Sequence, residues 1–166
     1  REVADTFSVP DRWILSRLQR TISRVTNSLD EFLFNDAANA LYDFLWHDFC
    51  DWYLEISKSR PGSRTLGVLV HVLETSLRLL HPIMPFITEE LWQRLRPPAS
   101  IMKAKWPVPT SRLLDERAEA DMARLRSVVT AIRNTRAELH VPLESRPPVR
   151  VASPQASVRT FFQTHQ

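Results

Sequence analysis

The sequence predicts an all-α fold, a bundle of about five helices, with the start of a small α/β unit at its C-terminal end. Apolar residues recur at steps of three or four over several long runs, which is the period of helices with one buried face. Only two glycines occur among the 166 residues, and most of the twelve prolines lie between these runs or near the C-terminus. Hairpins and sheets therefore have little to form from. We place the bundle at residues 1–142 and the C-terminal unit at residues 143–166.

The first predicted helix covers residues 11–32, with Asp11 as its N-cap. At about 100° per residue, three arginines cluster within about 60° of one another on the face opposite the apolar residues. This basic ridge is made of Arg17, Arg20 and Arg24. The apolar stripe that we expect to be buried is Ile14, Leu18, Ile22, Val25, Leu29 and Phe32.

The second predicted helix, residues 35–56, is the most aromatic part of the chain, with Asn35 as its N-cap and Asp36 in its first turn. Further aromatic residues lie off its apolar stripe, so this helix should be covered on more than one side. It is therefore the expected central helix of the bundle. The stripe comprises Ala38, Leu41, Leu45, Phe49, Trp52 and Ile56, and the additional aromatic residues are Tyr42, Phe44, Trp46 and Tyr53.

A third helix is expected at residues 65–80, where leucines and Val72 face inward. Pro82 and Pro85 then end it, because two prolines three residues apart cannot continue a helix. Thr88 is the predicted N-cap of a short fourth helix at residues 88–95, followed by a connection at residues 97–110.

The fifth predicted helix covers residues 115–140 and carries a near-heptad apolar seam. After Pro142 the pattern changes: residues 148–152 alternate like a short strand, and residues 156–162 could form a short helix. We expect these segments to begin the α/β unit. The seam of the fifth helix is Ala118, Met122, Leu125, Val129, Ile132 and Leu139.

Motifs of catalytic and metal sites are weak or missing in this sequence. Gly62 and Gly67 have the spacing of a phosphate-binding loop, but Val68 and Leu69 stand where lysine and Ser/Thr are required. The acidic residues and histidine at positions 47–55 could suggest a metal site, but no second helix offers a matching Glu-x-x-His pair. We interpret them as a polar helix face, and we predict neither a catalytic site nor a metal site.

Charge and cysteine content set broad limits on location and partners. A net charge of +3 is compatible with a polyanionic partner without requiring one. Cys50 is the single cysteine, so no intrachain disulfide can form, which favours a reducing compartment. No apolar run approaches the roughly 18 residues of a membrane-spanning helix. We expect a cytoplasmic chain without a membrane partner.

Arginine-rich helix faces and aromatic residues favour RNA binding. The basic ridge of the first helix, together with Arg126, Arg133 and Arg136 of the fifth, could contact phosphates. Any aromatic ring of the second helix left uncovered could stack on an unpaired base. The competing interpretation is a helical protein-interaction module, because aromatic residues at helical spacing are more often core and arginine rows are often only solvated.

Five segments in order resemble the anticodon-binding helical domain of the valyl-tRNA synthetases, a family of class I aminoacyl-tRNA synthetases. HPIMPFITEELW has close variants in the isoleucine and leucine families, which remain alternatives, whereas FCDWYLE at residues 49–55 favours valine. The resemblance covers nearly all of the chain. Its segments are DRWILSRL (11–18), FNDAANALYDFLWHDFCDWYLE (34–55), LETSLRLLHPIMPFITEELWQRL (73–95), SIMKAKWP (100–107) and AIRNTRAELHVP (131–142).

The resemblance implies a longer parent enzyme that joins valine to its tRNA with ATP and Mg. Its partners would be the anticodon stem-loop of tRNA(Val) and the catalytic domain of the same polypeptide. The HIGH and KMSKS signatures of that domain do not occur in this sequence, so we expect no catalytic residue and no cofactor in this segment. The chain also begins without methionine, as expected for a piece of a longer polypeptide.

The expected tRNA-binding residues follow from helix faces and side-chain chemistry, since the resemblance does not assign them. Guanidinium groups anchor phosphates, and aromatic rings stack on splayed bases. For phosphate contacts we predict Arg17, Arg20, Arg24, Arg133 and Arg136, and for base stacking Phe34, Tyr42 and Phe44.

Overall fold

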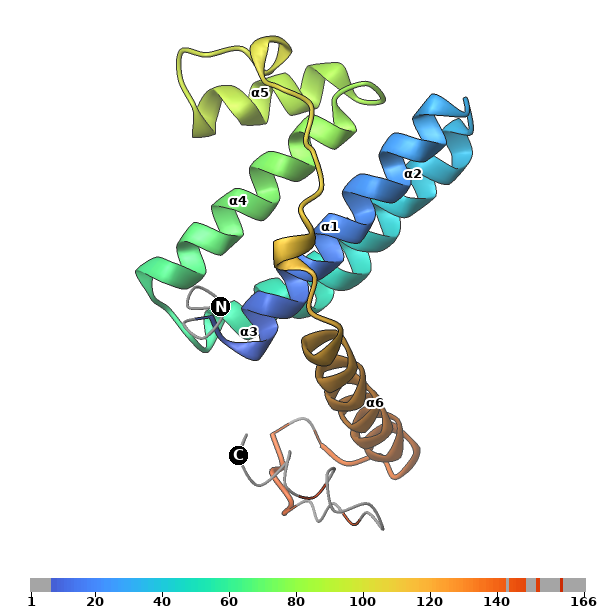
Figure 1. The fold of residues 1–166 in the computed structure, drawn as a ribbon. Coiled ribbons are helices and arrows are strands. Elements are labelled where there is room, and N and C mark those ends of the chain that lie inside the picture. Colours follow the sequence, from blue (N-terminus) through green and yellow to red (C-terminus); the bar gives the residue numbers. More distant parts are fainter. Residues whose placement is uncertain (1–6, 143, 149–151, 153–158, 160–166) are drawn as a thin grey trace. The chain divides into compact units, whose positions relative to one another are not determined.

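The computed structural model describes residues 7–142, 144–148, 152 and 159. It divides into two compact units, Arg1–Glu119 and Ala120–Gln166. Every regular element in the described part of the chain is helical, which confirms the all-α prediction (Figure 1). Most of residues 148–152 and 156–162 lie outside the described residues, so the C-terminal α/β unit stays a prediction.

Helix α1 (Val9–Asp30) begins before the predicted start because Ser8, not Asp11, is its N-cap. The Ser8 hydroxyl accepts the Asp11 N–H at 3.4 Å, and the Asp11 carboxylate accepts the Ser8 N–H at 3.1 Å. This reciprocal pair is a capping box, with the acidic residue at the third helical position. The predicted stripe is buried from Ile14 to Val25, whereas Phe32 follows the end of the helix and is 77% exposed.

The second predicted helix is a continuous helical stretch in three parts. It comprises α2 (Phe34–Tyr42), the π-helical segment η2 (Asp43–Leu54) and α3 (Glu55–Lys58). Its first turn has no side-chain cap, and it begins at Phe34 rather than after Asn35. A π-helix bonds each N–H to the carbonyl five residues back, so its turn is wider than that of an α-helix.

This wider turn changes which side chains of η2 are buried. The buried aromatic residues Phe44, Phe49 and Tyr53 follow one another at steps of five and four residues, and Asp48 is buried beside them. Trp52, which an α-helical period places in the stripe, is only partly buried. The predicted central position of this stretch is wrong: α1 is the helix on which α2, η2 and α4 (Ser63–Leu80) pack, whereas the stretch itself packs mainly against α1.

Helix α4 (Ser63–Leu80) ends before Pro82 as predicted, and α5 (Pro85–Leu95) starts at the second proline. The prediction that Thr88 caps α5 is wrong. Thr88 lies inside the helix, where its hydroxyl donates to the Met84 carbonyl at 2.8 Å. Pro85 starts the helix because its missing N–H would have no helical partner there. Trp92 of α5 packs with Leu77 of α4 and with Ile101 of the short 3-10 turn η3 (Ile101–Lys103).

The connection from α5 to α6 runs along α1 in the opposite direction (Figure 1). Trp106 Nε1 donates to Thr26 Oγ1 at 2.9 Å, and the Thr110 N–H donates to Gln19 Oε1 at 2.9 Å. Beyond the 3-10 turn η4 (Ser111–Leu113), the Asp115 N–H donates to Ser16 Oγ at 2.9 Å. Polar side chains of α1 therefore fix the connection along most of the helix.

Helix α6 (Glu116–Glu138) has a much weaker apolar side than the seam we predicted. Ala118 and Met122 are buried, but Leu125, Val129 and Ile132 are only partly buried, and Leu139 is 69% exposed. The helix is polar around most of its circumference, which is typical of a solvated helix.

We expect Tyr53 to make the fold sensitive to alkaline pH. Its hydroxyl donates to Asp11 Oδ1 at 2.6 Å and is buried, and burial, followed by this hydrogen bond, raises the pKa of Tyr53. A raised pKa means that the folded chain keeps a proton that the unfolded chain loses above about pH 10. Stability is therefore complete below that pH and falls above it, by up to about 1.4 kcal/mol per pH unit.

Urea unfolding of the wild type and of Tyr53→Phe between pH 9 and 11.5 tests this expectation. The free energy of unfolding of the wild type should fall more steeply than that of the variant. Parallel curves would mean that Tyr53 titrates alike in the folded and unfolded chains.

Candidate nucleic-acid interface

Two of the three arginines in the basic ridge are held by carboxylates of the same fold. Arg17 Nε donates to Asp48 Oδ2 at 2.7 Å, and Asp48 is only 5% exposed. Arg20 Nε donates to Glu119 Oε1 at 2.8 Å, and Glu119 raises the pKa of the Arg20 guanidinium. These guanidinium groups compensate acidic side chains, so the ridge presents less positive charge than its sequence indicates.

Arg24 is the exception within the ridge. It is exposed near the C-terminal end of α1, and no side chain in the described part of the chain forms an ion pair with it. Its positive charge is therefore the most available of the three for a phosphate group.

The arginines of α6 belong to the second unit. Arg133 is exposed, whereas Arg136 is half-buried and donates from Nη2 to the Pro142 and Ser145 carbonyls at 2.9 and 3.0 Å. From Ala120 to its end, the helix has four arginines against Asp121 and Glu138, which gives it an excess of positive charge. These arginines are Arg124, Arg126, Arg133 and Arg136.

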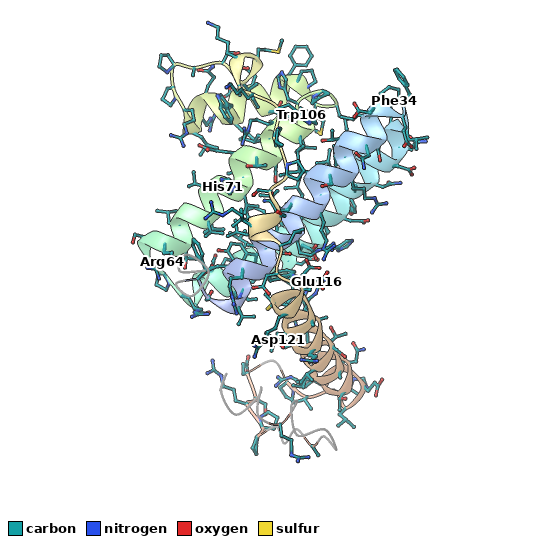
Figure 2. All side chains as sticks on the ribbon, in the orientation of Figure 1. Phe34, Arg64, His71, Trp106, Glu116 and Asp121 are labelled. Atoms are coloured by element: carbon teal, nitrogen blue, oxygen red, sulfur yellow. The ribbon has the colours of Figure 1, made fainter. Side chains whose placement is uncertain are left out.

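The aromatic residues predicted to stack on bases divide into exposed and buried ones. Phe34 is 60% exposed and projects from the end of α1 and α2 (Figure 2). Tyr42 is 57% exposed and lies parallel to the exposed ring of Trp46, with the ring centroids 6.2 Å apart. Phe44 is only 1% exposed, so assigning it to base stacking was wrong. Its ring continues the buried face of Ala37, Ala40 and Leu41, which precede it by seven, four and three residues, the spacing of one face of an α-helix.

Sequence reasoning missed Phe32 as a surface residue. It was placed in the buried stripe because it lies three positions after Leu29, but α1 ends before it. Its ring meets that of Phe34 edge to face, with centroids 6.3 Å apart. The available signal was an apolar run in a turn between two helices, a position that is usually at the surface.

An apolar groove of about 460 Å³ separates α2 and η2 from the turn between α4 and α5. Tyr42 and Trp46 line one side, and Leu80, Ile83 and Met84 line the other. Next to it, α5 exposes further apolar side chains that no part of the described chain covers. Among these are Phe86, Ile87 and Leu91, together with Met102 of η3.

Comparison with known proteins identifies the family to which this arrangement belongs. The family described as the anticodon-binding domain of tRNA ligase matches residues 11–152, which include every described helix except the first two residues of α1. The chain belongs to this family.

Several relatives of this anticodon-binding domain are valine--tRNA ligases. The enzyme of Thermotoga maritima is 50% identical over 86% of this chain and 17% of its own length. Those of Halalkalibacterium halodurans and Lactiplantibacillus plantarum are 42% and 39% identical over 94% and 98% of this chain. The domain spans 17 to 19% of the length of these three relatives.

Neither a cluster of metal-ligating side chains nor a candidate membrane span occurs in the described part of this anticodon-binding domain. Within it, no three His, Cys, Asp or Glu residues come together as metal ligands. None of the helices described there combines the length and the apolar character that crossing a bilayer requires.

Proposed function

We propose that this chain is the anticodon-binding domain of a valine--tRNA ligase. It binds the anticodon stem-loop of tRNA(Val) and holds the tRNA for aminoacylation, which uses ATP and Mg in a catalytic domain of the same longer polypeptide. The match of residues 11–152 to the family carries the proposal. The similar proteins are valine--tRNA ligases, which supports valine rather than isoleucine or leucine as the amino acid.

The exposed groups of the domain supply two kinds of RNA contact in this proposal. Arg24 contacts a phosphate, and secondary phosphate contacts come from arginines that also interact with groups of the protein, namely Arg17, Arg20, Arg133 and Arg136. Phosphate contacts set the position of an RNA without reading its sequence. The remaining contacts are base stacking on Phe34 and Tyr42, which reads an unpaired loop.

We place the domain in the cytoplasm as part of the same proposal. Cys50 is a free, half-buried thiol whose pKa is raised by burial and, to a lesser extent, by Asp51. A thiol of this kind suits a reducing compartment.

Fluorescence anisotropy with labelled anticodon stem-loops tests the proposal directly. The chain should bind the stem-loop of tRNA(Val) more tightly than that of tRNA(Ile) or one with the same stem and a scrambled loop. Equal affinity for all three RNAs would leave only non-specific binding, and an absence of binding would refute the proposal.

Replacing Arg24 with alanine should weaken binding about equally for all three RNAs and flatten its salt dependence. One lost phosphate contact reduces the slope of log K against log salt by about 0.7 to 0.9. Arg94→Ala is the matched control, since it removes the same charge from an exposed ion pair with Glu90 on α5. If both variants change the slope equally, Arg24 does not contact a phosphate.

A second candidate function is supported by the exposed apolar side of α5. Phe86 is 90% exposed and Met102 is 74% exposed, and uncovered apolar patches are typical of protein interfaces. A protein partner seated there would bind with little dependence on salt. Phe86→Ser should then weaken the binding of that protein partner while leaving the affinity for RNA unchanged.

A further inference from the structure

The turn between α1 and α2 has a phenylalanine where glycine is the usual residue. The Phe32 N–H donates to the Leu29 carbonyl at 3.1 Å, and the Leu33 N–H donates to the Ser28 carbonyl at 2.7 Å. These two bonds form a Schellman motif, whose residue after the C-cap adopts a left-handed conformation. Phe32 has a φ of 60° and occupies that position.

Burial does not offset this unfavourable backbone conformation. A left-handed conformation is disfavoured for any residue with a Cβ, and a bulky residue there is an outlier. The Phe32 ring is nevertheless 77% exposed. Its ring contact is with Phe34, at an interplanar angle of 77°, so the two rings form an exposed corner. Strain of this kind is concentrated at functional sites.

The charges beside the corner disfavour a phosphate as its ligand. Three carboxylates flank the two phenylalanines in the sequence, and all three are exposed: Asp30, Glu31 and Asp36. No lysine or arginine occurs between Arg24 and Lys58, a stretch that includes all of α2 and η2. Carboxylates repel a phosphate but accept hydrogen bonds from amino groups of bases.

We infer that Phe32 and Phe34 form a stacking site for one unpaired base of the anticodon loop, a base with an exocyclic amino group. The base lies on the face of one ring against the edge of the other, and its amino group is near the carboxylates. This inference rests on the proposed function and adds Phe32, with its acidic surroundings, to the residues that read the loop.

Phe32→Gly separates binding from folding. Glycine adopts the left-handed conformation without penalty, so the variant should have a higher Tm than the wild type. Loss of a stacked base should weaken binding of the tRNA(Val) stem-loop by about 5- to 150-fold, without changing the salt slope. A purely structural Phe32 would change only the Tm. Phe86→Ala, which removes a ring that is 90% exposed on α5, should change neither the Tm nor the affinity.

Stem-loops with one abasic nucleotide identify the base. At the position that stacks on Phe32, the losses from the abasic nucleotide and from Phe32→Gly should not add, whereas they should add at other positions. Uracil at that position should also bind more weakly than a base with an amino group. If the wild type binds the stem-loop and Phe32→Gly binds equally well, the inference fails. If the wild type does not bind, the proposed function fails as well.

Discussion

Replacing Phe44 with alanine should lower the free energy of unfolding by about 3 to 5 kcal/mol, the loss typical of a large aromatic residue removed from a core. Phe44 is 1% exposed on η2, which packs against both α1 and α2. Domains are stable by only about 5 to 15 kcal/mol, so this variant would lose a large part of its stability. Urea unfolding followed by circular dichroism measures the change.

Phe34→Ala provides the control for this experiment. Phe34 is 60% exposed, so its removal should change stability by less than about 1 kcal/mol while weakening RNA binding. Phe44→Leu retains most of the volume and gives a measurable, smaller loss if the alanine variant does not fold. Equal losses in the free energy of unfolding for Phe44→Ala and Phe34→Ala would mean that Phe44 is not a core residue.

Helix existence and order could be predicted from the sequence because they depend on apolar periodicity and on prolines. The predicted burial along residues 35–56 was wrong in detail for two reasons. Ala38, which is exposed, lies in the α-helical part and was assigned to the wrong face. In the π-helical part, the i to i+5 hydrogen bonds place Tyr53 rather than Trp52 in the core. Nothing in the residue types of this segment distinguishes the two kinds of helix.

Helix ends and ion pairs could not be predicted from the sequence for a different reason. Asp11 has the side chain of an N-cap, but Ser8 occupies that position and Asp11 completes the capping box. The arginine ridge was predicted from the face of a single helix. Its partners, Asp48 and Glu119, come from other elements that only the tertiary fold brings to α1.

The candidate RNA interface could be predicted only in part for the same reason. Arg24, Phe34 and Tyr42 are exposed, and their role in RNA binding stays a prediction. Phe44 had to be removed from the set and Phe32 added. Phe44 was assigned to the wrong helix face, since it follows the buried Ala40 and Leu41 at helical spacing. Phe32 has a left-handed backbone conformation, which side-chain type does not reveal.

Replacing Asp11 with alanine should lower the free energy of unfolding by about 2 to 4 kcal/mol, the sum of a lost helix cap and a buried donor left without a partner. Asp11 is 4% exposed and accepts hydrogen bonds from the Ser8 backbone and hydroxyl at 3.1 and 2.6 Å. It also accepts the Tyr53 hydroxyl at 2.6 Å, which joins α1 to η2. Urea unfolding at pH 7 measures the loss.

Asp30→Ala is the matched control, because Asp30 is an exposed aspartate at the opposite end of α1. A negative charge is unfavourable at a helix C-terminus, so its removal should leave stability unchanged or raise it slightly. Combining Asp11→Ala with Tyr53→Phe should cost less than the two single losses added together, since both remove the same hydrogen bond. Additive losses would mean that this bond contributes nothing, and that Asp11 stabilises the chain through the capping box alone.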